Sequence, residues 1–381
     1  MMTDEKTSYQ VHLFSNRLMR KYRQLRRWAR REHVMCYRLY DRDIPEVPLA
    51  VDMYEFLPDS VRTRAEAAQF AYEQAAAVRA NDAAAIADAE DRRWLRLFLY
   101  ERPYQKDAAE ESRWLEAMAA AASGVLHISR DHIITKMRKR QKGESQYERQ
   151  PMVENAAPCN GIGLVQEGGL LFKVNLRDYL DTGLFFDHRP LRALMRASCN
   201  EKRVLNLFCY TGSFSVYAAD GGARLVDSVD LSNTYLAWAQ ENMRCNGFAS
   251  HAPYRFIRND VSVFLDNRLS LSQQLRRAPD DGRYDIIILD PPTFSNSKST
   301  RSILDINRDW STLCTKCLRL LANNGTLYFS TNSQKLVFDT RLLPTTVNGN
   351  IISIEDITTA SLPEDFRSTR SRRCWRLQCT P

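Results

Sequence analysis

From about residue 200 onward, short apolar runs alternate with stretches of helix-forming composition. The runs read VLNLFC, LVDSVD, YRFIRND, YDIIILD, GTLYFST, IISIED and CWRLQC. This alternation predicts a doubly wound α/β sheet, because each run has the length of a buried strand and each intervening stretch can supply a covering helix. Ligands of such sheets bind beyond the carboxyl ends of the strands. The residues that follow each run are therefore the candidates for a functional site.

The earlier part of this 381-residue chain follows a different plan, and the length suits two or three folding units. Residues 34–57 read as two strands around a turn, and residues 161–177 read as a hairpin. Residues 61–123 are rich in Ala and Glu, which predicts an all-helical insertion. We therefore expect an α+β domain from residues 1–60 and 124–190, interrupted by this insertion, and a sheet domain over residues 191–381.

The charge of the chain points to an acidic partner. Its net charge is +8 and its pI about 9.0, which favours nucleic acid, although a merely soluble basic protein would have the same balance. Basic residues gather in segments 17–31, 136–142 and 367–376. The first predicts an amphipathic helix over residues 10–32 with a phosphate-binding cationic face. The second has Tyr147 close by, which suits stacking on RNA bases. Solvated surface is the alternative for the first segment, and an exposed flexible loop is the alternative for the second.

The cysteines argue against a secreted or metal-binding protein. Nine are scattered without paired spacing and no secretory signal starts the chain, so we expect reduced thiols and a cytoplasmic protein. Cys314 and Cys317 form a lone CxxC in a stretch that reads as helix, so no metal site is expected. The chain has no run of about 18 apolar residues, and we expect no association with a membrane.

The first strand of the predicted sheet ends in a single glycine. Gly212 follows the run that ends at Cys209, where the strand turns into a helix. A glycine at such a turn lets the backbone approach a ligand closely. A pyrophosphate-binding turn would need G-x-G-x-x-G, which is absent, so a dinucleotide is disfavoured. S-adenosylmethionine has no phosphate and would need only the close approach.

Acidic residues end the next two strands. Asp230 lies roughly 20 residues after the glycine, the spacing at which a carboxylate meets the two hydroxyls of a ribose. Asp260 ends the third strand and could accept a hydrogen bond from the amine of an adenine. Either residue could instead cap the helix that follows it.

The fourth strand carries the most specific signal. The buried run Ile286–Leu289 delivers Asp290, Pro291, Pro292, Thr293 and Phe294 at its tip. Two prolines remove two backbone donors and restrict two φ angles, so the loop is rigid. A rigid loop that presents Asp290 in one pose could position a planar base beside a methyl donor.

These features resemble class I S-adenosylmethionine-dependent rRNA methyltransferases. Among these, the chain resembles the C-terminal half of the fused 23S rRNA methyltransferases of the RlmKL family, the half that methylates guanine N7. The matching stretches are CYRLYDRDIPE (36–46), LRDYLDTGLFFDHR (176–189), NLFCYTGSFSVYAADGGA (206–223), VDLSNTYLAWAQENMRCNG (229–247) and LDPPTFSNSK (289–298). The resemblance implies a seven-stranded Rossmann-like methyltransferase sheet, preceded by a smaller α+β substrate-binding domain. It also implies S-adenosylmethionine as cofactor and 23S rRNA, single-stranded or opened, as partner.

The resemblance also assigns roles to individual residues. A segment that closes over the cofactor would contain Asp181, Gly183, Phe185, Asp187 and Arg189. Further cofactor-binding residues would be Asn206, Phe208, Tyr210, Thr211, Gly212, Asp230, Leu231, Asp260 and Asp290. The catalytic residues would be Asp290, Pro291, Pro292 and Phe294. The fused proteins carry a second methyltransferase and an RNA-binding module that this chain lacks, so we expect a stand-alone version whose RNA target could differ.

The chemistry of the strand tips discriminates between target bases. Methylation of cytosine C5 needs a cysteine that first attacks C6. The segments 290–293 and 329–332 contain none, and Cys209 is better explained by packing. Guanine N7 has an in-plane lone pair and needs mainly alignment, so we predict this target. An exocyclic amine is the alternative, although enzymes of that kind place an aromatic directly after the second proline, where Thr293 stands here.

Two other classes of function remain open. A non-catalytic RNA-binding factor for ribosome assembly could retain the fold, but intact acids at the strand ends argue against it. A methyltransferase for small molecules would not need three basic segments.

Overall fold

The computed structural model describes residues 2–100, 107–138, 161–248, 253–274, 282–295, 303–367 and 371–380. The chain divides into two compact units, Met1–Phe186 and Asp187–Pro381. The first unit contains α1 (Met2–Arg31), β1 (Cys36–Asp41), β2 (Leu49–Glu55), α2 (Arg64–Arg79), α3 (Ala83–Asp91), β3 (Arg93–Tyr100), α4 (Ala108–Leu126), β4 (Ile133–Arg138), β5 (Ile162–Glu167) and β6 (Leu170–Asn175).

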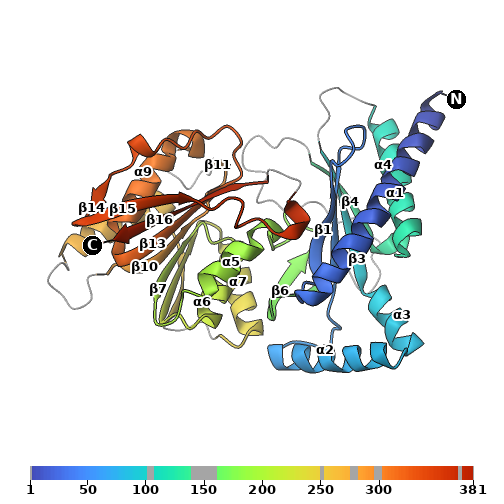
Figure 1. Ribbon diagram of the computed structural model, residues 1–381, viewed down its shortest axis with the longest axis horizontal. Coiled ribbons are helices and arrows are strands. Elements are labelled where there is room, and N and C mark those ends of the chain that lie inside the picture. The colour runs from blue at the N-terminus through green and yellow to red at the C-terminus, as the bar shows by residue number, and fades with distance from the viewer. Residues whose placement is uncertain are drawn as a thin grey trace. The chain divides into compact units, whose positions relative to one another are not determined.

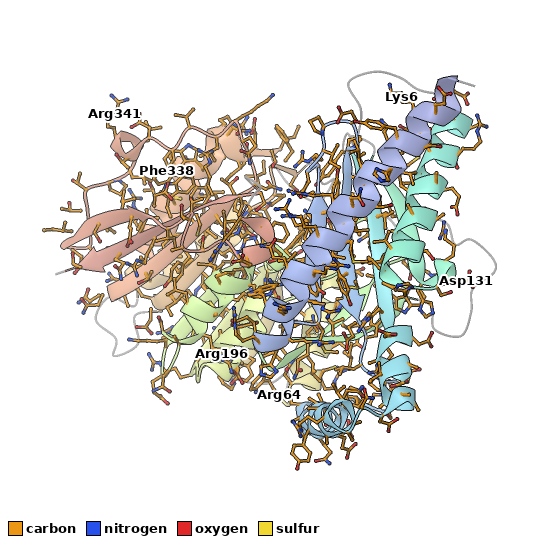
Figure 2. The ribbon with its side chains drawn as sticks, turned by 45° about the vertical axis from the view of Figure 1, so that its right-hand side comes forward. Lys6, Arg64, Asp131, Arg196, Phe338 and Arg341 are labelled. Carbon is orange, nitrogen blue, oxygen red and sulfur yellow. The ribbon has the colours of Figure 1, made fainter. Side chains whose placement is uncertain are left out.

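The first unit is built on a four-stranded sheet in the order β1-β2-β3-β4. Strands β1, β2 and β3 pair antiparallel, whereas β3 and β4 are parallel and α4 connects them. Helices α1 and α4 lie side by side on one face of this sheet (Figures 1 and 2). The buried stripe Phe14, Leu18, Leu25 and Ala29 of α1 packs there, which is why this helix is amphipathic as predicted. The predicted hairpin is β5–β6.

The prediction that residues 61–123 are all helical is wrong. Strand β3 runs through the middle of this range and pairs with both β2 and β4. Its sequence RWLRLFLY is rich in aromatic and apolar residues, but the Ala-rich helices on either side dominate the composition of the window. Only α2 and α3 therefore form an excursion between β2 and β3, and α4 belongs to the fold of the sheet.

The second unit contains the predicted doubly wound sheet. Its elements are α5 (Arg189–Arg196), β7 (Arg203–Leu207), α6 (Ser213–Asp220), β8 (Leu225–Asp230), α7 (Asn233–Cys245), β9 (Tyr254–Arg258), α8 (Val261–Gln274), β10 (Tyr284–Leu289), β11 (Phe294–Ser295), β12 (Leu304–Asp305), α9 (Ile306–Arg319), β13 (Leu321–Thr331), β14 (Thr346–Val347), β15 (Asn350–Asp356) and β16 (Arg373–Thr380). The strand order is β14-β15-β16-β13-β10-β7-β8-β9. The seven predicted strands are present, and the two-residue β14 adds an eighth at one edge.

Most strands of this sheet are parallel, and β16 runs antiparallel to both neighbours. The order reverses between β7 and β10, since β8 lies on one side of β7 and β10 on the other. The carboxyl ends of β7 and β10 therefore meet at the topological switch point, where open sheets of this type bind their ligands.

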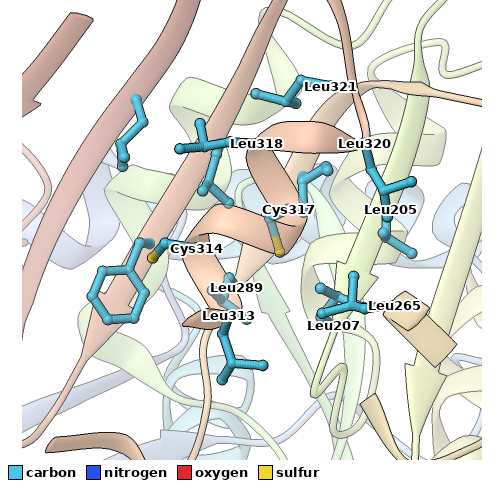
Figure 3. Packing of buried hydrophobic residues seen from close by; sticks show 14 of the residues in the cluster. Leu205, Leu207, Leu265, Leu289, Leu313, Cys314, Cys317, Leu318, Leu320 and Leu321 are labelled. Carbon is cyan, nitrogen blue, oxygen red and sulfur yellow. The ribbon is translucent and has the colours of Figure 1, made fainter. Parts of the chain in front are cut away.

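The core of the second unit explains its cysteine pair. Alternate residues of the central strands, such as Leu205 and Leu207, face helix α9. Cys314 and Cys317 lie on the buried face of α9 among these leucines (Figure 3). Burial raises the pKa of both thiols well above the usual range. They act as small apolar core residues.

No helix within the described residues is both long enough and apolar enough to span a bilayer.

Candidate functional site

The turn after β7 has an unusual backbone. Phe208, Tyr210 and Gly212 all have positive φ, at 54°, 53° and 72°. A bulky residue rarely adopts this conformation, and such strained turns gather at ligand sites. Backbone hydrogen bonds help to hold the turn: the Cys209 N–H donates to the Val229 carbonyl at 3.0 Å, and the Gly212 N–H donates to the Cys209 carbonyl at 2.9 Å. The switch point thus carries a rigid, preformed loop.

Gly212 is required by packing as well as by its positive φ. A Cβ atom at this position would lie 2.7 Å from the Cβ of Ala239 in α7. Such a contact is too short for two carbon atoms, so the missing side chain admits helix α7. The sequence suggests that this glycine allows the close approach of a ligand. The structure adds a second reason, the close packing of α7, which the sequence pattern does not reveal.

Asp230 ends β8 beside this turn. Its Oδ2 accepts a hydrogen bond from the Tyr210 N–H and its Oδ1 from the Ser232 N–H, both at 2.9 Å. Burial raises the pKa of Asp230, and the backbone donors oppose this effect. Each carboxylate oxygen keeps a further lone pair. The carboxylate is therefore held in one orientation and can still accept hydrogen bonds from a diol.

Asp260 caps helix α8. Its Oδ1 accepts hydrogen bonds from the backbone N–H groups of Ser262 and Val263, at 2.8 and 3.1 Å. Helix capping, the alternative reading of this residue, is thus observed. Its proposed contact with an adenine amine would have to use the other oxygen. Leu231 is half-buried, and its carbonyl accepts a hydrogen bond from Arg258.

Three residues that were predicted to bind the cofactor have buried side chains. Asn206 is 1% exposed and donates to Ser215, and Thr211 is fully buried. Arg189 is 8% exposed and forms a 3.0 Å ion pair with Asp365. The Asn206 and Arg189 side chains are thus engaged within the unit, and the roles of all three residues toward a cofactor stay predictions.

Two side chains contact the Asp290 carboxylate. The Nε2 atom of His188 lies 3.2 Å from its Oδ2, and the Ser330 hydroxyl donates to its Oδ1. His188 and Ser330 are 6% and 1% exposed, whereas the Asp290 side chain is 27% exposed. Ser330 comes from β13, the strand next to β10 in the sheet. Asp290 therefore faces solvent at the strand tips with both oxygens oriented from below.

His188 is neutral in this arrangement. Burial lowers its pKa to about 3, and the guanidinium groups of Arg372 and Arg192 act in the same direction, while Asp290 opposes them. A neutral imidazole can still donate one N–H to the carboxylate.

The rest of the Asp-Pro-Pro loop is anchored to neighbouring elements. The Thr293 hydroxyl donates to the Oδ1 atom of Asn332 at 2.7 Å, and the Thr293 carbonyl accepts from the Ile306 N–H. Pro291 is buried and Pro292 half-buried. Phe294 is 57% exposed, so its ring is available to a partner as the catalytic assignment requires.

Sequence reasoning missed His188, Ser330 and Asn332. His188 stands between Asp187 and Arg189, which were selected instead. Only the backbone carbonyl of Asp187 has a described contact, with Arg372. Ser330 and Asn332 could have been found from the sequence, because they lie at the end of the fifth predicted strand, where site residues are expected.

Three arginines of the C-terminal basic segment contact other residues of the second unit. Arg372 is 2% exposed and donates to the carbonyls of Asp187 and Ser361. Arg373 donates to the carbonyls of Ser333 and Leu336, and Arg376 pairs with Glu355. Arg372, Arg373 and Arg376 thus have partners within the unit, and RNA binding by the segment 367–376 stays a prediction. Residues 139–142 of the second basic segment lie outside the described residues, and Lys136 donates to the Arg177 carbonyl.

Other predicted residues lie in the first unit. Asp181, Gly183 and Phe185 precede its end, and their role toward a cofactor stays a prediction. Among the described residues, no group of three or more His, Cys, Asp or Glu side chains is arranged to hold a metal ion.

The fold and the switch-point site define a nucleoside-binding transferase. The strained turn and the Asp230 carboxylate fit a ribose-bearing cofactor without phosphate, and the Asp290 loop lies beside them on the same sheet edge. A profile of S-adenosylmethionine-dependent methyltransferases matches residues 86–365. The chain belongs to this family, and S-adenosylmethionine is its cofactor.

Similar proteins come from several bacteria. The ribosomal RNA large subunit methyltransferase K/L of Stutzerimonas stutzeri is 40% identical over 368 residues, which is 96% of this chain and 42% of that protein. The protein of the same name from Magnetococcus marinus is 39% identical over 370 residues, 97% of this chain and 43% of its own length. The chain thus spans less than half of the relatives that it matches.

Solved structures share the fold. The crystal structure of SMU.776 in complex with SAH has a TM-score of 0.66 and 21% identity, and the match covers 97% of this chain and 81% of that one. A protein from Streptococcus mutans assigned as a SAM-dependent methyltransferase gives a TM-score of 0.63 with the same coverage. At this identity the similarity supports the architecture of both units.

Proposed function

We propose that this chain transfers a methyl group from S-adenosylmethionine to guanine N7 in 23S rRNA. The carrying observation is the position of the Asp290 carboxylate at the strand tips, where it contacts neutral His188 and accepts a hydrogen bond from Ser330. The names of the K/L relatives support ribosomal RNA as the substrate class. Work on this RNA would take place in the cytoplasm.

The cofactor supplies a methyl group made electrophilic by its sulfonium charge. Asp230 and the turn from Phe208 to Gly212 would hold its nucleoside part. Guanine N7 attacks through an in-plane lone pair, so alignment by the rigid loop is the main requirement. The purine gains a positive charge as it is methylated. Asp290 would stabilise this charge, and the neutrality of His188 leaves the carboxylate charge available for the purpose.

Two other targets differ in what they require of the site. Cytosine C5 needs a thiolate, but Cys209 is 5% exposed and burial raises its pKa well above the usual range. An exocyclic amine must lose a proton, which Asp290 could accept. The amine is therefore the second candidate, and the product distinguishes it from N7.

The proposed reaction is tested by its product. The purified chain is incubated with S-adenosylmethionine and 23S rRNA from a strain that lacks the gene, and the digested RNA is mapped by mass spectrometry. We expect 7-methylguanosine at one site. The appearance of N2-methylguanosine or 5-methylcytidine in its place would contradict the choice of atom, and the absence of any methylated nucleoside would contradict the enzyme function.

An arginine ridge on α1 supports RNA as the partner. The ridge consists of Arg20, Arg23, Arg26, Arg27 and Arg30, all of which are exposed. Within the described part of the chain, none of the five forms a salt bridge. The other basic residues of the segment differ, since Arg17 and Lys21 pair with the buried Asp43 and Arg31 pairs with Glu32. The ridge therefore offers uncompensated charge to phosphates.

Replacing Arg23, Arg27 and Arg30 by glutamine should weaken RNA binding and its dependence on salt. Each phosphate contact on single-stranded RNA contributes about 0.7 to the magnitude of the slope of log K for binding against log salt concentration. The magnitude of this slope should therefore fall by about 2 in the triple variant. The slope is measured by filter binding of 23S rRNA fragments between low and physiological salt.

A charge-matched control separates a local contact from the effect of net charge. Arg62, Arg79 and Arg244 are also exposed but lie outside the ridge. Their replacement by glutamine removes the same charge and should leave the slope close to that of the unmodified protein. Equal slopes for the two triple variants would show that the ridge makes no specific contact.

A further inference from the structure

Asn332 presents a fixed hydrogen-bond donor at the tip of β13. Its Oδ1 accepts the Thr293 hydroxyl at 2.7 Å, so the amide is oriented by the Asp-Pro-Pro loop itself. Asn332 is exposed, whereas Thr331 before it and Ser333 after it are buried. No described residue accepts a hydrogen bond from its Nδ2. The two N–H bonds of this amide are therefore open to a ligand.

The backbone that carries Asn332 is anchored on both sides. The Ser333 hydroxyl donates to Asn307 of α9 at 2.6 Å, and Arg373 of β16 donates to the carbonyls of Ser333 and Leu336. A few residues further on, Phe338 stacks on Trp375, with ring centroids 4.2 Å apart. A donor on such a rigid support can discriminate between ligands, since little freedom is lost on binding.

The same sheet edge carries the Asp290 carboxylate. Strands β10 and β13 are adjacent, and two side-chain hydrogen bonds join their tips, Ser330 to Asp290 and Thr293 to Asn332. The edge thus combines an anion with a neutral donor. The Hoogsteen edge of guanine carries the acceptor O6 beside N7, which the amide donor can pair with, while adenine has an amine donor in the position of O6.

We propose that Asn332 determines the specificity for guanine by donating from Nδ2 to O6 of the target base. This inference rests on the proposed function and names the group that reads the base. In adenine an amine replaces O6, so this amine and the Asn332 Nδ2 group would face each other as two donors without acceptors. Thr293 is the positioning residue, because its hydroxyl occupies Oδ1 and so turns Nδ2 toward the base.

The first test uses two variants on unmodified 23S rRNA. Asn332→Ala should lower kcat/KM for N7 methylation by roughly 10- to 100-fold, while S-adenosylmethionine binds as before. Asn332→Asp should be worse than alanine, because a carboxylate repels O6. An aspartate variant as active as the unmodified protein would mean that the side chain offers an acceptor, and this would overturn the inference.

The second test removes O6 from the RNA. After the methylated nucleotide is mapped, splint-ligated 23S rRNA is prepared with 2-aminopurine there, which keeps N7 and lacks O6. We expect the unmodified protein and Asn332→Ala to react with this RNA at similar single-turnover rates, because the lost contact is the same. If Asn332→Ala lowers the single-turnover rate as much on the 2-aminopurine RNA as on the guanine RNA, Asn332 acts through structure alone. Failure of the unmodified protein to produce 7-methylguanosine would instead contradict the proposed function.

Discussion

Replacing Asp290 by alanine is expected to lower kcat for methyl transfer by about 10²- to 10³-fold, the range observed when one preorganised electrostatic group is removed from an active site. His188 and Ser330 contact the carboxylate, which in the proposed reaction would stabilise the charge that the purine gains. The variant loses this charge and leaves two buried donors without their acceptor. Single-turnover transfer of a labelled methyl group measures the rate, and calorimetry measures binding of S-adenosylmethionine.

Asp290→Asn tests whether charge or shape matters. Asparagine has the size of aspartate and can still accept one of the two hydrogen bonds, but it is neutral. We expect it to recover little of the lost rate. Asp266 provides a matched control, since it lies on α8 in an exposed pair with Lys316 and its replacement by alanine should not affect the rate. A rate unchanged in Asp290→Ala, with cofactor still bound, would exclude the proposed role.

The strand-end residues could be predicted because they depend on short-range patterns. A four-residue apolar run followed by Asp290 fixes the strand, its end and the following loop at once. Parallel strands bring such ends to a common edge, so the sequence places Asp230 and Asp290 on one side of the sheet. The predicted doubly wound sheet and N-terminal amphipathic helix are confirmed for the same reason.

The supporting residues could not be predicted because their partners are distant in sequence. Arg189 and His188 are neighbours, yet Arg189 pairs with Asp365, 176 positions away, and His188 meets Asp290. Nothing in the local pattern shows which of two adjacent residues faces the site. The burial of Arg372 could not be predicted for the same reason. A basic run in a sequence looks like solvated surface until the hydrogen-bond acceptors of its side chains are known.

Strand β3 shows a different limit. Its eight residues lie between Ala-rich helices, and a composition averaged over residues 61–123 hides them. The strand becomes visible only as the partner of β2 and β4, since both of its edges are paired. Tertiary pairing overrides the average propensity of the window here.

Breaking the buried ion pair between Arg189 and Asp365 should destabilise the second unit by about 3–5 kcal/mol, because the remaining charge stays buried without its partner. The Arg189 side chain is 9% exposed and the Asp365 side chain 0%, so water cannot replace the lost group. Urea unfolding of Arg189→Ala gives the free energy. Hydrogen exchange of peptides covering residues 187–196 and 357–367 then locates the change. Arg341→Ala, which breaks the exposed pair with Asp339, should leave the unfolding midpoint unchanged.

The ion pair should also matter for catalysis, because it holds the residue next to it in the chain. His188 stands between Arg189, fixed by Asp365, and Asp187, whose carbonyl accepts two hydrogen bonds from Arg372. Both anchors come from the segment between Asp365 and Arg372, so loosening it should release His188 from Asp290. We therefore expect Arg189→Ala to lower kcat even where the protein remains folded, with a smaller loss than for Asp290→Ala. A folded variant with normal kcat, unchanged exchange and unchanged stability would show that the pair does not position this histidine.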